Sequence, residues 1–433
     1  MLHSLWTDGV TLPNFDTLGG NKKTDVLIIG GGMCGLLCAY FLRQAGVDVL
    51  LVEGSRIASG ITKNTTAKIT AQHGLIYAKL LGTEGKEKAQ MYLTANLRAL
   101  HAYEQLCTEL DCTFEKKPAY TYSLTHRARL EDEVRAVNDL GFPAVFAETT
   151  ELPLKTQGAV CFPDQAQFHP LKFLAALTKG LPIYENTFIR DITPTTAIAD
   201  GGTVTAKHII VATHFPFINK HGSYFLKLYQ HRSYVSAWEG AGSLQGMYVD
   251  EDKKGMSFRS YGDLLLLGGG GHRTGKQGGG WEELNAFAHC HYPEAKLQFQ
   301  WAAQDCMSLD GIPYIGQYSK RTPNLYVASG MNKWGMSTSM VAAMLLTDMV
   351  TGKSNDLAPV FSPQRSMAKP QLLVNGIEAT VNLLTPTTKR CPHLGCALKW
   401  NPAEHSWDCP CHGSRFEENG KLMDNPATGD ANV

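Results

Sequence analysis

Residues 24–53, TDVLIIGGGMCGLLCAYFLRQAGVDVLLVE, constrain the fold more than any other part of the chain. The apolar run at 25–29 predicts a buried parallel strand. Gly30, Gly32 and Gly35 follow with the spacing G-x-G-x-x-G. In such a loop the first glycine allows a tight turn, the second lets the backbone approach a pyrophosphate, and the third lets a helix pack on the strand. The sequence therefore predicts a dinucleotide site, with a merely tight turn as the alternative.

The residues around these glycines support the same site. A helix at 33–44, with Met33 and Cys34 in its first turn, would point its N–H groups at the phosphates. The next strand ends at Glu53, about 20 residues beyond the glycines, where an acid hydrogen-bonds a ribose 2′-OH. A loop of small and hydroxyl residues follows, in place of the crossover helix of an NAD dehydrogenase. This loop suits a larger cofactor, and its predicted contacts are Gly54, Arg56, Thr65, Thr66 and Ala67.

Composition excludes several classes of partner. The 433 residues include 40 basic and 40 acidic side chains, so no charged surface for nucleic acid or anionic membrane is predicted. The sequence shows no apolar run long enough to span a bilayer and no secretion signal, and we expect a cytoplasmic protein. Four of the eleven cysteines lie in the last tenth of the chain, and this clustering indicates a metal site.

Between these ends, the patterns predict an additional domain. Helical segments are expected at 78–109, 127–140 and 281–299, a strand at 118–124, and a strand, a turn and a helix within 159–180. Residues 229–275 predict β-hairpins, with Arg259 and Tyr261 either lining a cavity or lying at an exposed edge. The run Gly268 to Gly271 could be a phosphate loop, but a strand that passes close to another backbone explains it better. Gly352 and the three prolines that follow it without periodicity indicate a linker at 353–370.

Three further segments resemble one flavoprotein family. They are TAKHIIVAT at 205–213, DGIPYIG at 310–316 and GMNKWGM at 330–336. Together with the N-terminal site they are similar to the glutathione-reductase-type FAD fold and, within it, to the D-amino-acid oxidase/glycine oxidase-like (DAO) family. His214 departs from the family, in which glycine is usual. The resemblance implies FAD as cofactor and adds the contacts Ile189, Ala212, Thr213, Gly311, Gly330, Met331, Asn332, Lys333, Gly335 and Met336.

The same resemblance implies hydride transfer from a small amine or amino acid to the flavin. No compelling acid–base pair is visible in the sequence, and an amine that is already neutral requires none. Lys333 and Trp334, in the turn expected over the flavin ring, and His73, after the FAD loop, are the catalytic candidates. A purely structural role remains open for each of the three.

A second motif lies near the C-terminus. The segments Cys391-Pro-His393-Leu-Gly-Cys396 and Cys409-Pro-Cys411-His412-Gly-Ser414 each place a cysteine and a histidine on a tight loop, and two such loops could hold one metal centre. They resemble the loops of a Rieske [2Fe–2S] domain. The resemblance implies that Cys391 and Cys409 ligate one iron and His393 and His412 the other, and that Cys396 and Cys411 form a disulfide. A Cys2His2 zinc site is the alternative.

We therefore predict an α/β chain in three parts. Residues 1–352 form a Rossmann-type FAD domain with an inserted α+β substrate domain from segments 77–180 and 229–310. The linker 353–370 precedes a short all-β Rieske domain at 371–433. The predicted function is oxidation of a small-molecule substrate, with electrons passed singly to the cluster and then to an acceptor protein. Reversed electron flow, or a redox sensor or carrier without its own substrate, are the alternatives, and the sequence names neither substrate nor oligomeric state.

Overall fold

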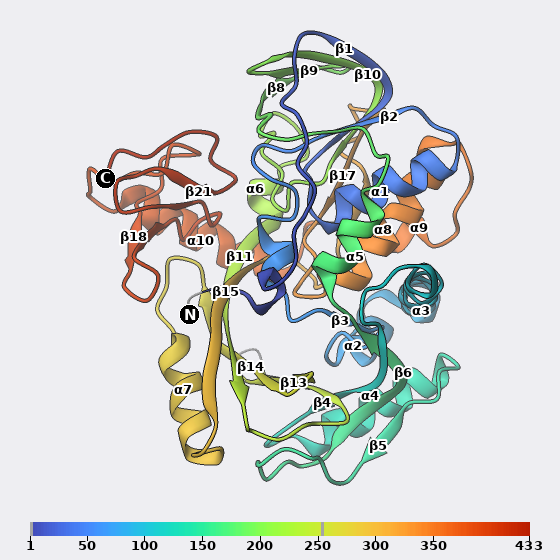
Figure 1. The fold of residues 1–433 in the computed structure, drawn as a ribbon, viewed down its shortest axis with the longest axis vertical. Helices are drawn as coiled ribbons and strands as arrows, with labels where there is room; N and C mark the ends of the chain where they lie inside the picture. Colours follow the sequence, from blue (N-terminus) through green and yellow to red (C-terminus); the bar gives the residue numbers. More distant parts are fainter. Residues whose placement is uncertain (1–2, 253–254) are drawn as a thin grey trace.

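The computed structural model describes residues 3–252 and 255–433. It contains two large sheets, one in the upper and one in the lower part of the view in Figure 1, and a small C-terminal sheet to their left. The first large sheet has the order β16-β17-β10-β1-β2-β7, and β9 joins β10 to β8. Its strands are β1 (Lys22–Ile29), β2 (Val49–Val52), β7 (Ile183–Tyr184), β8 (Ile189–Ile192), β9 (Thr196–Ala199), β10 (Gly202–Val211), β16 (Tyr314–Gln317) and β17 (Leu325–Ser329). Strands β2, β1, β10 and β17 are parallel to one another, as a dinucleotide-binding fold requires, whereas β9 and β16 pair antiparallel with β10 and β17.

The second large sheet has the order β15-β11-β14-β13-β12-β4-β6-β3, with β5 paired to β6. Its strands are β3 (Lys68–Ile69), β4 (Glu115–Tyr122), β5 (Val145–Ala147), β6 (Ala159–Gln167), β11 (Leu228–Glu239), β12 (Met247–Asp250), β13 (Ser257–Tyr261), β14 (Leu264–Arg273) and β15 (Lys296–Ser308). The two predicted insertions supply most of it, so segments distant in sequence build one sheet. Together the two large sheets confirm the predicted α/β class.

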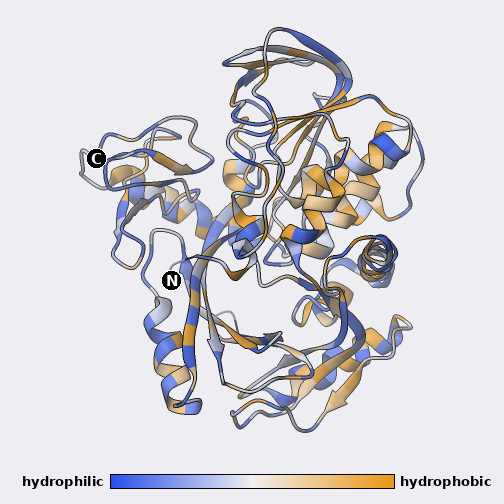
Figure 2. Ribbon diagram, in the orientation of Figure 1, coloured by the Kyte–Doolittle hydropathy of each residue, from blue (hydrophilic) through white to orange (hydrophobic). Residues whose placement is uncertain are grey.

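Helices surround these sheets. They are α1 (Met33–Gln44), α2 (Ile76–Glu84), α3 (Lys86–Glu109), α4 (Arg127–Asp139), α5 (Pro170–Leu177), α6 (Tyr224–Lys227), α7 (Gly280–His291), α8 (Gly335–Val350), α9 (Ala358–Phe361) and α10 (Pro370–Leu384), with short 3₁₀ turns η1 (Leu5–Thr7) and η2 (Ile61–Asn64). Helices α1 and α8 are mostly hydrophobic (Figure 2), and their buried residues belong to the same core as Val26 and Ile28 of β1. No helix in the described ranges is long and apolar enough to cross a membrane.

Two expectations about this region need correction. The helix expected at 281–299 ends at His291, because Tyr292 precedes Pro293 and a residue before proline disfavours the helical conformation. Leu297, Phe299 and Trp301 then alternate in strand β15. Arg259 is fully buried rather than at an exposed edge, and neither it nor Tyr261 is among the described residues that line the cavity below. Gly268 to Gly271 lie inside strand β14, which agrees with the strand interpretation.

The C-terminal region contains the predicted small β-sheet and a helix that was not predicted. Its sheet runs β18 (Lys399–Asn401), β19 (Ser406–Asp408), β20 (Arg415–Phe416) and β21 (Leu422–Asp424). Helix α10 precedes it, begins with Pro370 in its first turn, and lies between the flavoprotein body and the small sheet (Figure 1). Near the C-terminus, Arg390 forms isolated β-bridges with Ala397 and Asn432.

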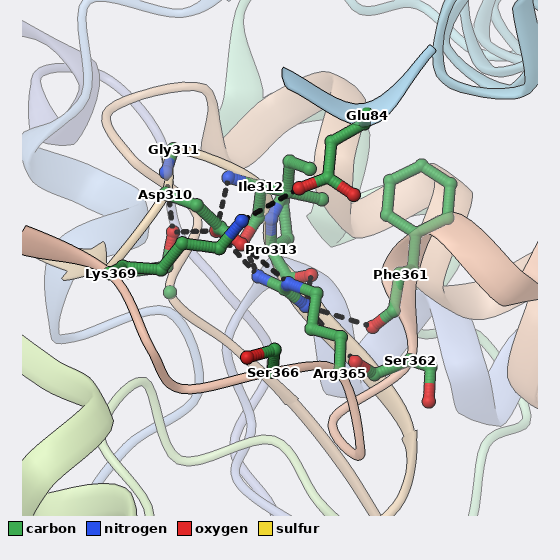
Figure 3. A network of polar contacts seen from close by, with 12 residues as sticks. Glu84, Asp310, Gly311, Ile312, Pro313, Phe361, Ser362, Arg365, Ser366 and Lys369 are labelled. Carbon is green, nitrogen blue, oxygen red and sulfur yellow. Dashed lines mark hydrogen bonds and ion pairs between the residues drawn. The ribbon is translucent and has the colours of Figure 1, made fainter. Parts of the chain in front are cut away.

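The segment expected to be an irregular linker is anchored to the flavoprotein body. Helix α9 lies within it, and the following Arg365 forms a bidentate pair with Asp310, with N–O distances of 2.7 and 2.8 Å (Figure 3). The guanidinium also donates to the carbonyl groups of Pro313, at 3.1 Å, and of Ile312. Lys369 pairs with Glu84 of α2 at 2.7 Å. Two ion pairs therefore hold this segment, one against the DGIPYIG region and one against α2.

Candidate functional site

The three glycines of the N-terminal motif have different surroundings. A Cβ atom on Gly35 would lie 1.9 Å from the carbonyl oxygen of Gly30, so this glycine is needed for the contact between α1 and β1. Gly30 has a φ of +112° and lies against the backbone of Ala212. The nearest atom to a Cβ on Gly32 would be Thr62 Oγ1 at 3.3 Å, and Gly32 lines a cavity. The space beside the second glycine is therefore open to a pyrophosphate, as the motif requires.

Glu53 is held in place by backbone donors. Its Oε2 accepts from the N–H of Gly31 at 2.7 Å, and its Oε1 accepts from the N–H of Ser55 at 2.9 Å. Burial raises the pKa of this carboxyl, although both backbone hydrogen bonds oppose the increase. The carboxylate is therefore positioned at the end of β2, where a ribose hydroxyl would bind.

A single cavity of about 1570 Å³ extends from this motif to the second large sheet. Most of the predicted cofactor contacts line it: Gly30, Gly32, Met33, Cys34, Glu53, Gly54, Arg56, Thr65, Thr66, Ile189, Ala212, Thr213, Gly311, Met331, Asn332, Lys333, Gly335 and Met336. The predicted contacts Gly35, Ala67 and Gly330 are not among its lining residues. Its size and its glycine-lined end fit a molecule as long as FAD.

The two cysteine–histidine loops have the same turn. In each, the N–H of the glycine four residues after the first cysteine donates to that cysteine's carbonyl, from Gly395 to Cys391 and from Gly413 to Cys409, both at 2.9 Å. Both glycines have positive φ, near 80°, which explains why glycine follows each ligand pair. A disulfide between Cys396 and Cys411 joins the loops.

The loops bring two thiols and two imidazoles together. The Nδ1 atoms of His393 and His412 lie 3.3 Å apart, close enough for both nitrogens to bind one metal ion. The neighbouring Cys409 thiol lowers the pKa of Cys391 to about 7, which favours a thiolate. Cys396 and Cys411 also lie near Cys409, but their disulfide removes them as ligands. The donor set that remains fits a histidine-ligated [2Fe–2S] cluster.

Comparison with known families agrees with both halves of this geometry. Residues 25–349 match the family described as FAD dependent oxidoreductase (DAO), and residues 353–433 match the Rieske [2Fe-2S] domain. The chain belongs to the DAO family of FAD-dependent oxidoreductases. It carries a C-terminal Rieske domain, so its cofactors are FAD and a [2Fe–2S] cluster, and the zinc alternative is wrong.

Three similar proteins illustrate the match. The putative Rieske 2Fe-2S iron-sulfur protein YhfW of Bacillus subtilis is 32% identical over 98% of this chain and 95% of its own length. The cytochrome b6-f complex iron-sulfur subunit of Nostoc punctiforme is 54% identical over 8% of this chain and 21% of its own length. The crystal structure of glycine oxidase from Geobacillus kaustophilus covers 80% of this chain and 100% of its own, with a TM-score of 0.68 and 23% identity, which shows a shared fold.

The three catalytic candidates of this DAO-family chain line the cavity but have different environments. His73 hydrogen-bonds the hydroxyl of Tyr92 at 2.6 Å and the carbonyl of Thr70 at 2.9 Å, and its ring stacks on Trp334. Burial lowers the pKa of His73 to about 3, so the ring is neutral at physiological pH. Lys333 lies in an exposed turn with a φ of +73°. His73 is therefore a neutral ring held in place by hydrogen bonds and by stacking on Trp334.

Two cations lie beside the cavity, buried Arg259 and half-buried Lys68, and sequence reasoning did not identify Lys68. Lys68, on β3, lines it, and burial together with the charge of Arg259 lowers its pKa to about 7. Arg259 donates to the carbonyl of Ala67 at 3.0 Å and to that of Thr66, while its Nε and Nη2 have no hydrogen-bond partner among the described residues. Lys68 stands in the hydroxyl-rich segment TKNTTAKIT, which was the available signal. Lys68 therefore places a cation at the cavity, and Arg259 lies close enough behind it to act on its pKa.

The Rieske domain is docked on the second large sheet of the flavoprotein. Gln304 of β15 donates to the carbonyl of Gly413 at 2.8 Å, and Arg273 of β14 donates to that of Pro410 at 3.2 Å. Buried Arg232 of β11 pairs with Glu404, which also pairs with Arg415 at 2.8 Å. Strands of the FAD-binding part therefore contact the cluster loop directly.

Proposed function

We propose that this protein oxidises a small amine or amino acid at its FAD and passes the electrons one at a time to its own [2Fe–2S] cluster. The observation that carries this proposal is the shared cavity, which is lined both by the FAD motif and by C-terminal residues such as Arg415 and Asn425. A glycine oxidase shares the fold of the flavoprotein part, which favours amine or amino-acid substrates. The two redox sites are thus built into one docked unit.

The residues of the chain would bind the cofactor in distinct ways. The first turn of α1 carries no acidic side chain, so its N–H groups and dipole can receive the pyrophosphate. Glu53 would accept from a ribose hydroxyl. The N-terminus of α8 at Gly335 lines the other end of the cavity, where its dipole would stabilise negative charge. When bound, FAD would accept a hydride and release electrons one at a time.

Lys68 provides a means of recognising an acidic substrate. Its ammonium group lines the cavity, and no carboxylate is among the causes that shift its pKa. A carboxylate on the substrate would supply the opposite charge in a site where burial strengthens the interaction. This arrangement favours an amino acid over a simple amine. The neutral state of His73 agrees with a substrate that reacts as the free amine.

An anaerobic titration tests the proposal. Adding small amino acids or amines to the oxidised protein should bleach the flavin and then produce the EPR signal of a reduced histidine-ligated cluster. In a Cys391→Ser variant the flavin should still bleach, but the cluster signal should be missing. If no substrate bleaches the flavin while a reductase reduces the cluster, electron flow in the reverse direction is supported. If the protein exchanges electrons only with other proteins, it is a carrier.

A further inference from the structure

The two histidines proposed as iron ligands are contacted by one segment of the flavoprotein, residues 214–225. The outer nitrogen of His393, Nε2, lies 3.0 Å from Oδ1 of Asn219. The ring of Phe225 lies 6.3 Å from the ring of His412, centroid to centroid, in an edge-on arrangement. The ring of Phe215 lies 6.5 Å from the ring of His393 and 6.1 Å from that of His412, centroid to centroid. The side of the histidines that faces away from the cysteines is therefore covered by the protein's own FAD-binding part.

The contact with Asn219 favours the tautomer of His393 that carries its proton on Nε2. An imidazole that donates from Nε2 has its lone pair on Nδ1, and the two Nδ1 atoms face each other at 3.3 Å. Both rings are thus oriented for a metal before it binds. Such outer partners hold the ligand ring in position and increase its basicity.

We infer that segment 214–225 orients both cluster histidines and lowers the cluster's reduction potential, with Asn219 as the positioning residue for His393. The inference rests on the ligand set proposed above. An acceptor on Nε2–H moves electron density toward the ring and the iron, which stabilises the oxidised cluster relative to the reduced one. Because Asn219 belongs to the flavoprotein part, the potential of the cluster is set in part by the domain that supplies its electrons.

Two substitutions of similar size separate this role from simple packing. Asn219→Leu removes the acceptor, and Asn219→Asp keeps an acceptor at the same place and adds a negative charge. In the full-length protein with both cofactors, an EPR-monitored redox titration should give a higher cluster midpoint potential for Asn219→Leu and a lower one for Asn219→Asp. The flavin midpoint potential should not change. Asn21→Leu is the matched control, because exposed Asn21 only accepts from Thr203 at the start of β10.

The possible outcomes are distinct. If both Asn219 variants keep the parent potential, the positioning role is wrong while the ligand set stands. If the parent protein itself lacks the signal of a histidine-ligated cluster, the ligand set fails and the inference fails with it. If Asn219→Leu does not assemble a cluster, Asn219→Asp alone tests the positioning role. A cluster midpoint potential in Asn219→Asp that is not lower than in the parent protein would contradict that role.

Discussion

At the scale of single residues, burial changes the chemistry of ordinary side chains. His73 loses its proton, and Lys68 approaches neutrality near physiological pH, because each is removed from water beside the cavity. Asn219 shows the opposite case, since it is exposed yet contacts a proposed metal ligand. The residue type alone therefore does not reveal the role.

Lys68 leads to a prediction about pH. Its pKa of about 7 means that the free protein holds the charge below pH 7 and loses it as pH rises. Binding of acetate or a similar small carboxylate, followed by the change in flavin absorbance, should be tight between pH 5 and 7 and weaken above it. Lys68→Met should weaken binding at pH 6 by roughly tenfold or more, the value of a charge-assisted hydrogen bond of about 1.5–3 kcal/mol.

The pH profile of the variant provides the check. Lys68→Met should bind the carboxylate with no inflection near pH 7. If carboxylate binding by the parent protein shows no inflection near pH 7, or if Lys68→Met keeps the inflection, the pH dependence does not come from Lys68. Lys63→Met, which alters a half-buried lysine that also lines the cavity, is the control and should keep the inflection.

At the scale of elements, the connection between α8 and α10 is held by a buried ion pair. Arg365 and Asp310 are both nearly inaccessible, with exposed side-chain fractions of 11% and 7%. Burial alone would raise the pKa of Asp310, but the hydrogen bonds and charge of Arg365 outweigh it and lower the pKa overall. The pair fixes Asp310 beside Gly311 at the cavity (Figure 3).

Breaking this pair should destabilise the protein. Arg365→Met leaves a buried carboxylate without its partner, at a cost of about 3–5 kcal/mol in the free energy of unfolding. Adding Asp310→Asn should recover part of the loss, because the unpaired charge is removed. Because the folded pKa of Asp310 is lowered, the stabilisation is present above the unfolded pKa of about 3.9 and is lost as pH falls through the folded pKa.

Urea unfolding of the flavin-loaded protein at several pH values measures these effects. The parent should lose more stability than Arg365→Met as pH falls from 5 toward 3. Arg127→Met, which breaks a fully exposed pair with Glu148, should change little. Equal losses in the Arg365 and Arg127 variants would contradict the assigned role of burial.

At the scale of the whole molecule, docking of the Rieske domain depends on Glu404. This carboxylate lies between Arg232 of the flavoprotein and Arg415 of the C-terminal sheet, and both guanidinium groups are buried. Burial would raise the pKa of Glu404, but the two arginine charges lower it overall. The Arg232–Glu404 pair therefore joins the two parts across their interface.

We expect Glu404→Leu to release the C-terminal domain without touching the cluster ligands. The variant leaves Arg232 buried and unpaired, whereas Arg415 retains Asp408 at 3.0 Å. Calorimetry should resolve a C-terminal transition at lower temperature than in the parent, and substrate-driven reduction of the cluster should slow while flavin bleaching persists. Glu418→Gln, at an exposed pair with His405, is the control. A single unchanged transition in the Glu404 variant would show that other contacts hold the domains.

Contiguous patterns in the sequence determined the two cofactors. The glycine spacing of 30–35 and the acid at 53 lie within one β-α-β unit, and each cysteine–histidine pair lies on one closed turn, so local geometry alone specifies them. Most of the predicted flavin contacts line one cavity, but they come from distant segments that the fold brings together. The end of α7 was missed because Pro293 was not taken as a helix stop, and α10 was missed because Pro370 was assigned to a linker rather than to the first turn of a helix.

Tertiary structure alone decided how the parts act on one another. Lys68 and Arg259 are 191 positions apart and meet only because β3 and β13 join one sheet, and desolvation there shifts their pKa values. Asn219 reaches His393, and Glu404 reaches Arg232, across an interface between distant segments. Such contacts depend on the packing of whole elements, which no local spacing encodes. For that reason the charges around the cavity and the contacts of the cluster histidines are determined only in the folded chain.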